Sequence, residues 1–182
     1  MGCKNCILCK KFLVETDSFK SYECPETYQI KDSITCTDEG VIYLIRDLIC
    51  KKSYIGSTMH SMRVRWANYK NHIKSGYSGC ELATHFKETV SKHPLKFGSG
   101  KGRVDEIYNA CLIEQLDVTI IEKVNMSGCE SKAEKRRALE RAEGRWQTEL
   151  RTMTRYGGLN KKDDRKITNR KASNYHSSSV NP

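Results

Sequence analysis

The segments Val41-Ile42-Tyr43-Leu44-Ile45 and Ser53-Tyr54-Ile55-Gly56-Ser57-Thr58 are separated by seven residues of irregular pattern. Each is short, rich in β-branched and aromatic residues and apolar at alternate positions, which is typical of two strands joined in a hairpin. In a simple register Tyr43 lies opposite Tyr54, and both rings then lie on one face of the sheet. Tyrosine is also a common strand residue, so the hairpin alone leaves packing as an alternative role for the pair.

The segment that follows the hairpin predicts a helix over about residues 60 to 75. Its apolar side chains recur at helical spacing, at Met62, Trp66, Tyr69 and Ile73. Arg65, Tyr69 and His72 form an adjoining stripe at positions i, i+4 and i+7. The hairpin therefore leads directly into a helix that presents a guanidinium, a phenol and an imidazole.

The remainder of the chain predicts two more helices and a third strand. We expect a helix over Glu81–Lys92, a strand over Val118–Val124, and a helix from about residue 130 to 153. With the hairpin, this order indicates an α+β fold in which helices flank a small three-stranded antiparallel sheet. Glu143 borders the apolar stripe of the last helix, where a dehydrated carboxylate is costly unless a cation compensates it.

Length and charge limit the class of protein. A chain of 182 residues is long enough for one domain with a small appendage. We expect an intracellular protein without a membrane partner, because no apolar run approaches ~20 residues and the N-terminus lacks an apolar signal core. The 32 Lys and Arg residues outnumber the 22 Asp and Glu residues, which favours a nucleic-acid partner, although solubility alone also explains such an excess.

Nine cysteines, an odd number, argue against complete disulfide pairing and favour metal binding. The first 37 residues contain Cys3-x-x-Cys6-x-x-Cys9, then Cys24 and Cys36, and we expect zinc to stabilise this cysteine-rich segment. Cys50 should not share an ion with Cys36, because a straight hairpin holds them ~20 Å apart at ~3.4 Å per residue. The expected ligands are therefore Cys3, Cys6, Cys9 and Cys36, with Cys24 in reserve. The alternative is a disordered leader with scattered thiols.

Several signatures occur in a fixed order: Val41-Ile42-Tyr43, Tyr54-Ile55-Gly56, Arg65 before Trp66, Glu143 three residues before Trp146, and Asn160 at the end of Tyr156-Gly157-Gly158-Leu159-Asn160. Together they resemble a GIY-YIG nuclease domain over residues 38–160, with Val41 in place of the first glycine. The upstream cysteines and Leu82-Ala83-x-His85-Phe86 are most similar to the endonuclease domain of Penelope-like retroelements. Those elements usually keep a Cys-x-x-Cys at the hairpin tip. Here Asp47 replaces its first cysteine, which is expected to remove one possible metal site.

The resemblance implies a metal-dependent DNA endonuclease that cleaves target sites for a retroelement. It assigns Tyr43 as the base, Tyr54 to orienting the phosphate or water, and Arg65 to the non-bridging oxygens. Glu143 would hold a single Mg²⁺ or Mn²⁺ ion. Supporting roles fall on Tyr69, which would assist phosphate binding, on Asn160, which would fix the arrangement, and on Gly56, Ser57 and His72 as substrate contacts.

The sequence is also compatible with functions other than DNA cleavage. A catalytically inactive, zinc-stabilised nucleic-acid-binding module is the main alternative, and a thiol redox enzyme lacks the βαβ pattern it would need. Residues 161–182 are basic without apolar period, so we expect a disordered tail that follows phosphates or directs nuclear import. The sequence leaves the oligomeric state open, as it does an association with a reverse transcriptase domain.

Overall fold

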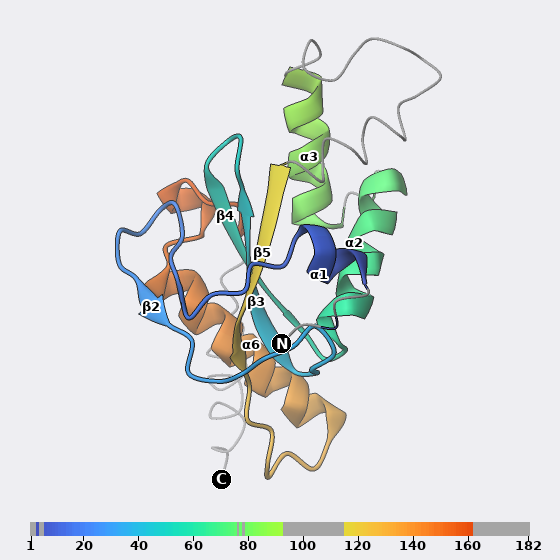
Figure 1. Cartoon of the computed structure of the whole chain (residues 1–182), viewed down its shortest axis with the longest axis vertical. Coiled ribbons are helices and arrows are strands. Elements are labelled where there is room, and N and C mark those ends of the chain that lie inside the picture. Colours follow the sequence, from blue (N-terminus) through green and yellow to red (C-terminus); the bar gives the residue numbers. More distant parts are fainter. Residues whose placement is uncertain (1–2, 4–5, 76, 78, 93–114, 162–182) are drawn as a thin grey trace, which may run out of the picture.

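The computed structural model describes residues 3, 6–75, 77, 79–92 and 115–161. Its centre is a three-stranded antiparallel sheet in the order β4-β3-β5, with β3 at Val41–Asp47, β4 at Lys52–Thr58 and β5 at Leu116–Lys123 (Figure 1). The predicted α+β class with a small antiparallel sheet is confirmed. β3 is buried along almost its whole length because it lies between two strands and is covered on both faces.

The register of the hairpin differs from the simple one predicted. Tyr43 pairs with Gly56, and Tyr54 pairs with Ile45. The turn explains the difference: Asp47 Oδ1 accepts hydrogen bonds from the amides of the two turn residues Ile49 and Cys50, and Lys51 has a φ of 56°. This centres the turn one residue later than a symmetric connection between the two tyrosines would. A shift of two in the pairing keeps both tyrosines on one face, because side chains alternate with period two.

Helices cover the two faces of the sheet. α2 (Met62–Ser75) and α3 (Glu81–Lys92) pack on the face that carries Tyr43, through side chains such as Trp66 and Phe86. α6 (Lys132–Glu149) packs on the opposite face against Ile42, Leu44 and Ile55. A capping box at its N-terminus satisfies the first turn, and a short 3₁₀ helix, η1 (Thr154–Tyr156), follows it.

The N-terminal segment is part of the same core. It contains α1 (Ile7–Lys11) and the short strands β1 (Ser18–Phe19) and β2 (Tyr28–Gln29), which pair with each other. Backbone hydrogen bonds join Phe12 and Val14 to Val118 of β5, so the segment crosses one edge of the sheet. Before the crossing the Phe12 ring packs on Trp66 of α2, and after it the Phe19 ring packs on Trp146 of α6. The segment therefore covers both faces, as its path in Figure 1 shows.

The ends of the predicted elements agree closely with the structure, except for the last helix. The third strand and α3 lie where the pattern indicated, whereas α6 ends at Glu149, before the predicted Met153. Within the described part of the chain, no helix combines the length and apolar character needed to cross a bilayer. The predicted disordered tail lies outside the described residues, apart from Lys161.

Candidate functional site

The structure brings Tyr43, Tyr54, Arg65 and Tyr69 together in a group that we term the tyrosine–arginine cluster. The hydroxyls of Tyr43 and Tyr69 are 2.7 Å apart and share a hydrogen bond. Arg65 donates from Nε to the Tyr43 hydroxyl at 3.1 Å and from a terminal nitrogen to the Tyr69 hydroxyl at 3.3 Å, while its guanidinium lies 4.5 Å from the Tyr69 ring centroid. The rings of Tyr54 and Tyr69 meet edge to face at 6.5 Å. Strand alternation and an i, i+4 helix pair thus produce one hydrogen-bonded group.

The phenols of this cluster differ in access to solvent. Tyr43 and Tyr69 are fully buried, whereas Tyr54 and Arg65 are partly exposed. Burial raises the pKa of Tyr43 well above its ordinary value, and the nearby Arg65 only partly opposes that shift. Burial also raises the pKa of Tyr54, and electrostatic repulsion by Tyr43 and Glu143 adds to the shift. All three phenols are therefore neutral at pH 7, and Tyr54 is the one that solvent reaches.

Gly56 has a packing role directly opposite Tyr43. A Cβ at this position would lie 2.5 Å from the Tyr43 hydroxyl and 2.6 Å from Cζ of its ring. Only glycine leaves room for that ring to lie flat across β4. Packing accounts for this glycine, and its contact with substrate stays a prediction.

Glu143 lies on the opposite face of the sheet, on α6 beside β4. Its carboxylate accepts a hydrogen bond from the Ser57 hydroxyl at 2.5 Å and one from Gln147 Nε2 at 3.2 Å. Ser57 and Tyr54 project from opposite faces of β4. Because β4 is an edge strand, no further strand separates the surface around Ser57 from the surface around Tyr54. Repulsion by the Glu143 carboxylate is one contribution to the raised pKa of Tyr54, smaller than burial and than the effect of Tyr43.

Asn160 supports the strand that carries Tyr54 and Gly56. Its side-chain oxygen accepts from the Ile55 amide at 2.9 Å, and its side-chain nitrogen donates to the Ile55 carbonyl at 2.7 Å. Because β4 is an edge strand, these bonds replace the main-chain partner that a further strand would supply. The backbone of Asn160 is held in turn by Thr152 and Thr154. This is a supporting position, of the kind the resemblance implies for this residue.

His72 is the predicted site residue for which the structure gives least support. Its ring packs on Tyr77 at 4.9 Å, and its buried Nδ1 has no hydrogen-bond partner among the described residues. The three cluster residues of α2 and β3 bond to one another without it. Its predicted contact with substrate stays a prediction.

The four cysteines expected to bind zinc form a compact group, which we term the four-cysteine group. Cys3 and Cys9 sulfurs are 3.8 Å apart, as are those of Cys6 and Cys36, and all four lie within 4.8 Å of one another. A tetrahedral zinc site with Zn–S bonds of ~2.3 Å has sulfur–sulfur edges of about 3.8 Å. The group can therefore hold a metal ion such as zinc. Cys24, the reserve ligand, is buried elsewhere.

One cluster was missed by the sequence reasoning. Asp47, Cys50 and His85 lie together at the hairpin tip, although Asp47 was expected to remove a metal site there. The available signal was the position of Asp47 three residues before Cys50, since a carboxylate is a metal ligand as a thiolate is.

Comparison of the chain with protein-family models, with curated proteins and with solved structures gave no match.

Proposed function

We propose that the chain is a metal-dependent DNA endonuclease of the GIY-YIG type, which cuts target sites for a Penelope-like retroelement. The observation that carries the proposal is the tyrosine–arginine cluster, in which the strand phenol of Tyr43 shares hydrogen bonds with a guanidinium and a phenol from the adjacent helix, and the second strand phenol, Tyr54, packs against that helix phenol. The carboxylate of Glu143, within electrostatic reach of Tyr54, adds the acidic group that phosphodiester hydrolysis needs.

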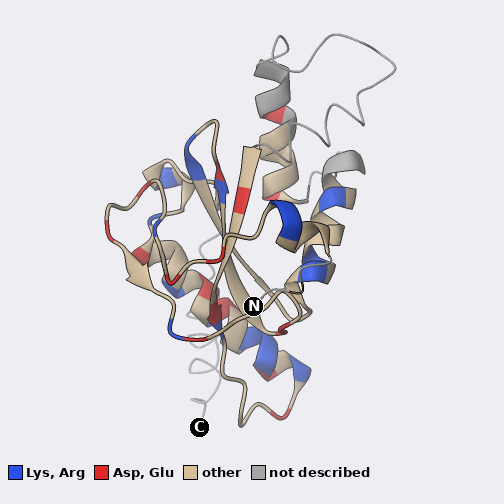
Figure 2. Cartoon of the chain, in the orientation of Figure 1, with Lys and Arg blue, Asp and Glu red and all other residues tan. Residues whose placement is uncertain are grey.

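Charge on α2 supports a nucleic-acid substrate. The helix carries Arg63, Arg65, Lys70 and Lys74 and contains no acidic residue. Figure 2 shows basic residues along α2 and on the neighbouring α1, whose last turn contains Lys10 and Lys11. A phosphate backbone that follows this surface would be led toward the partly exposed Arg65.

The residues around Glu143 fit a hard divalent cation. The carboxylate is an oxygen ligand, and the Ser57 hydroxyl beside it is a second oxygen donor. Mg²⁺ is commonly held by one or two carboxylates together with water and substrate phosphate, so a single acidic residue is sufficient. When bound, Mg²⁺ or Mn²⁺ would stabilise negative charge on the departing oxygen.

The tyrosine–arginine cluster would bind the phosphate and supply the base. Arg65 uses two of its N–H groups on Tyr43 and Tyr69, and its others are available for a non-bridging phosphate oxygen. Tyr54, the exposed phenol, orients the phosphate or the attacking water. Tyr43 accepts a hydrogen bond from Arg65, which favours its ionised form. The small ionised fraction of Tyr43 would act as the base: its phenolate oxygen would take up the proton that the attacking water loses, relayed through the Tyr69 hydroxyl, and Tyr43 would become a neutral phenol.

A plasmid-nicking assay with Mg²⁺ and with EDTA tests the proposal. Arg65→Ala and Glu143→Gln should each lower the cleavage rate by about a hundredfold or more, because each removes charge stabilisation in the transition state. Arg136→Ala removes the same charge from an exposed position of α6 and is the matched control for Arg65→Ala, as Glu149→Gln on the same helix is for Glu143→Gln. Both controls should keep cleavage within a few-fold of wild type.

DNA binding separates this function from the inactive module. Glu143→Gln should bind a labelled duplex as tightly as wild type, since the basic surface of α2 is unchanged. Binding by the wild-type chain without any metal-dependent cleavage would leave the binding module as the function. Mg²⁺-dependent cleavage that survives in both Arg65→Ala and Glu143→Gln would refute the roles proposed for these residues.

A further inference from the structure

Gln147 is a buried amide on α6, one helical turn after Glu143. The two residues are four positions apart, so their side chains lie on the same face of the helix. Gln147 is 2% exposed, and its Nε2 donates to Glu143 Oε1 at 3.2 Å. Within the described part of the chain its Oε1 has no hydrogen-bond partner, so the bond to Glu143 is the only one that this side chain makes.

Fold stability does not explain an amide at this position. A buried amide oxygen without a hydrogen bond destabilises the folded state, because it has lost its bonds to water. Other side chains that α6 buries against the sheet are apolar, among them Leu139 and Ala142. An unbranched apolar side chain of similar length, such as methionine, would fill the same space without an unpartnered oxygen. The role of Gln147 therefore lies in its bond to Glu143.

The carboxylate of Glu143 fixes which way this amide points. A carboxylate only accepts hydrogen bonds, so the Gln147 nitrogen must face it and the Gln147 oxygen must face away. Turning the amide over would place two acceptor oxygens against each other. The unpartnered oxygen is thus a consequence of the donation to Glu143.

Glu143 is held at both of its carboxylate oxygens. The Ser57 hydroxyl on β4 donates to Oε2 at 2.5 Å, and Gln147 donates to Oε1. Donors from two elements restrain the rotation of a long side chain that would otherwise sample many rotamers. Both donors are uncharged, so neither cancels the negative charge of the carboxylate, as the guanidinium of Arg145 does at Glu122. The two bonds therefore fix the direction of the carboxylate without neutralising it.

We propose that Gln147 is a positioning residue for the divalent cation and holds the Glu143 carboxylate in the direction that ligates Mg²⁺ or Mn²⁺. A carboxylate has about four lone-pair sites, so the bonds from Ser57 and Gln147 leave room for a metal ligand. Loss of a group that hydrogen-bonds a metal-ligating carboxylate typically lowers metal affinity or activity by about 10–100-fold. The inference rests on the function proposed above, since that function assigns Glu143 to the cation.

Loss of the amide should weaken cation binding and leave the chemical step intact. Once the cation is bound, Glu143 and the tyrosine–arginine cluster are all present, so cleavage at saturating Mn²⁺ should stay within a few-fold of wild type. The Mn²⁺ concentration that gives half-maximal nicking should rise by about tenfold or more. A loss of fold stability alone would instead reduce the active fraction at every Mn²⁺ concentration.

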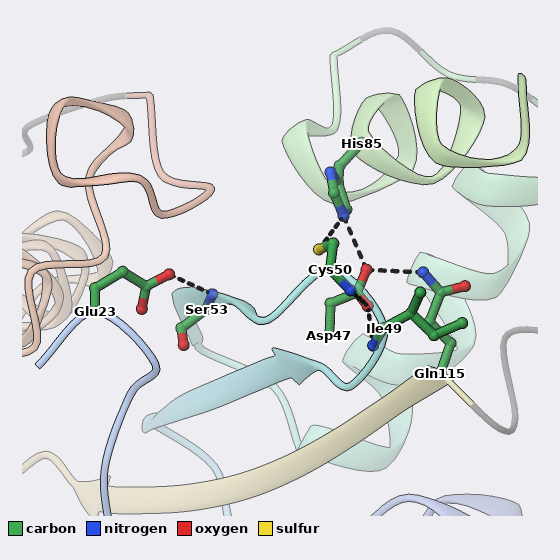
Figure 3. Close-up of polar contacts among 7 residues, drawn as sticks. All are labelled: Glu23, Asp47, Ile49, Cys50, Ser53, His85 and Gln115. Carbon is green, nitrogen blue, oxygen red and sulfur yellow. Dashed lines mark hydrogen bonds and ion pairs between the residues drawn. The ribbon is translucent and has the colours of Figure 1, made fainter. Parts of the chain in front are cut away.

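Gln147→Met tests the inference, and Gln115→Met is its matched control. Gln147→Met removes the donor and the unpartnered oxygen together, so the melting temperature should be unchanged or higher, by up to about 4 °C. Gln115 is also buried and donates to a carboxylate, that of Asp47 at the hairpin tip (Figure 3). Gln115→Met should lower the melting temperature and leave the Mn²⁺ dependence of nicking unchanged. A melting temperature well below wild type in Gln147→Met would overturn the inference, because the amide would then serve the fold.

Direct binding of Mn²⁺ to the full chain gives a readout that does not need cleavage. Electron paramagnetic resonance measures the free ion, and the binding that Glu143→Gln abolishes defines the site. Its dissociation constant should be about tenfold or more higher in Gln147→Met than in wild type, and unchanged in Gln115→Met. Equal dissociation constants in Gln147→Met and wild type would overturn the inference. Absence of cleavage by wild type would refute the proposed function alone, because the Mn²⁺ affinities still test Gln147.

Discussion

Replacing Gly56 by alanine should damage the candidate site more than it damages the fold. The new methyl group would lie 2.5 Å from the Tyr43 hydroxyl and 2.8 Å from Cε2 of its ring. Ordinary contact begins near 3.4 Å, so the Tyr43 ring must move by about 0.9 Å. Overpacking of this kind costs about 1–3 kcal/mol, and the lower entropy of the unfolded alanine chain returns ~0.4–1 kcal/mol. The net loss should be about 1–2 kcal/mol, or a melting temperature lower by about 2–8 °C.

The same displacement should disrupt the tyrosine–arginine cluster. The 2.7 Å bond from Tyr43 to Tyr69 and the 3.1 Å bond from Arg65 would stretch beyond hydrogen-bonding distance if the ring moved away from them. We expect nicking to fall by about a hundredfold while most of the protein stays folded at 25 °C. Thermal unfolding and the nicking assay measure the two effects. In a Tyr43→Leu background the same substitution should cost less stability. An unchanged melting temperature and cleavage rate in Gly56→Ala would refute this account.

Three further predictions follow from the described contacts. Asn160→Ala should lower the free energy of unfolding by about 2–4 kcal/mol, because both main-chain groups of the buried Ile55 lose their partner. Urea denaturation measures this loss, and an unchanged free energy of unfolding would contradict the supporting role of Asn160. Since burial raises the pKa of Tyr43, its ionised fraction and the cleavage rate should grow about tenfold per pH unit from pH 7 to 9, and a flat profile would exclude a phenolate base. Cys36→Ser should lower the melting temperature and slow cleavage at saturating Mg²⁺ by about tenfold, because it removes one sulfur of the four-cysteine group, and loss of the metal would loosen the segment whose Cys36 carbonyl accepts from the Arg63 amide at the start of α2.

The sequence predicts the sheet and its helices because the apolar periods are strong and uninterrupted. Short runs of β-branched and aromatic residues mark β3 and β4, and α3 begins and ends at the predicted residues, Glu81 and Lys92. The register was less accessible, since it depends on how the Asp47 side chain folds the turn back onto the amides of Ile49 and Cys50. That contact depends on the side-chain conformation and has no hydrophobic period.

The sequence predicted which residues come together at the candidate site better than it predicted how deeply they are buried. The spacing of Arg65 and Tyr69 on one helix requires that they be neighbours, and both contact Tyr43. The complete burial of Tyr43 and Tyr69 was not predictable, because it arises from packing against the N-terminal segment and α3. The contacts of His85 were not predictable for the same reason, because its partner Asp47 lies at the hairpin tip, distant in sequence.

The position of β4 at the edge of the sheet makes the candidate site possible. Tyr54 and Ser57 occupy positions of opposite parity, so their side chains leave the strand on opposite faces. In a central strand, neighbours on both sides would separate these faces, and Tyr54 and the Glu143 carboxylate that accepts from Ser57 would lie on unconnected surfaces. At an edge no further strand lies between the two faces, but the main-chain groups on the outer side of the strand have no strand partner. Asn160 supplies two of those partners at Ile55, between the tyrosine and the serine. The predicted loss of stability in Asn160→Ala and the predicted loss of cleavage in Glu143→Gln therefore have a common structural origin, the exposed edge of β4.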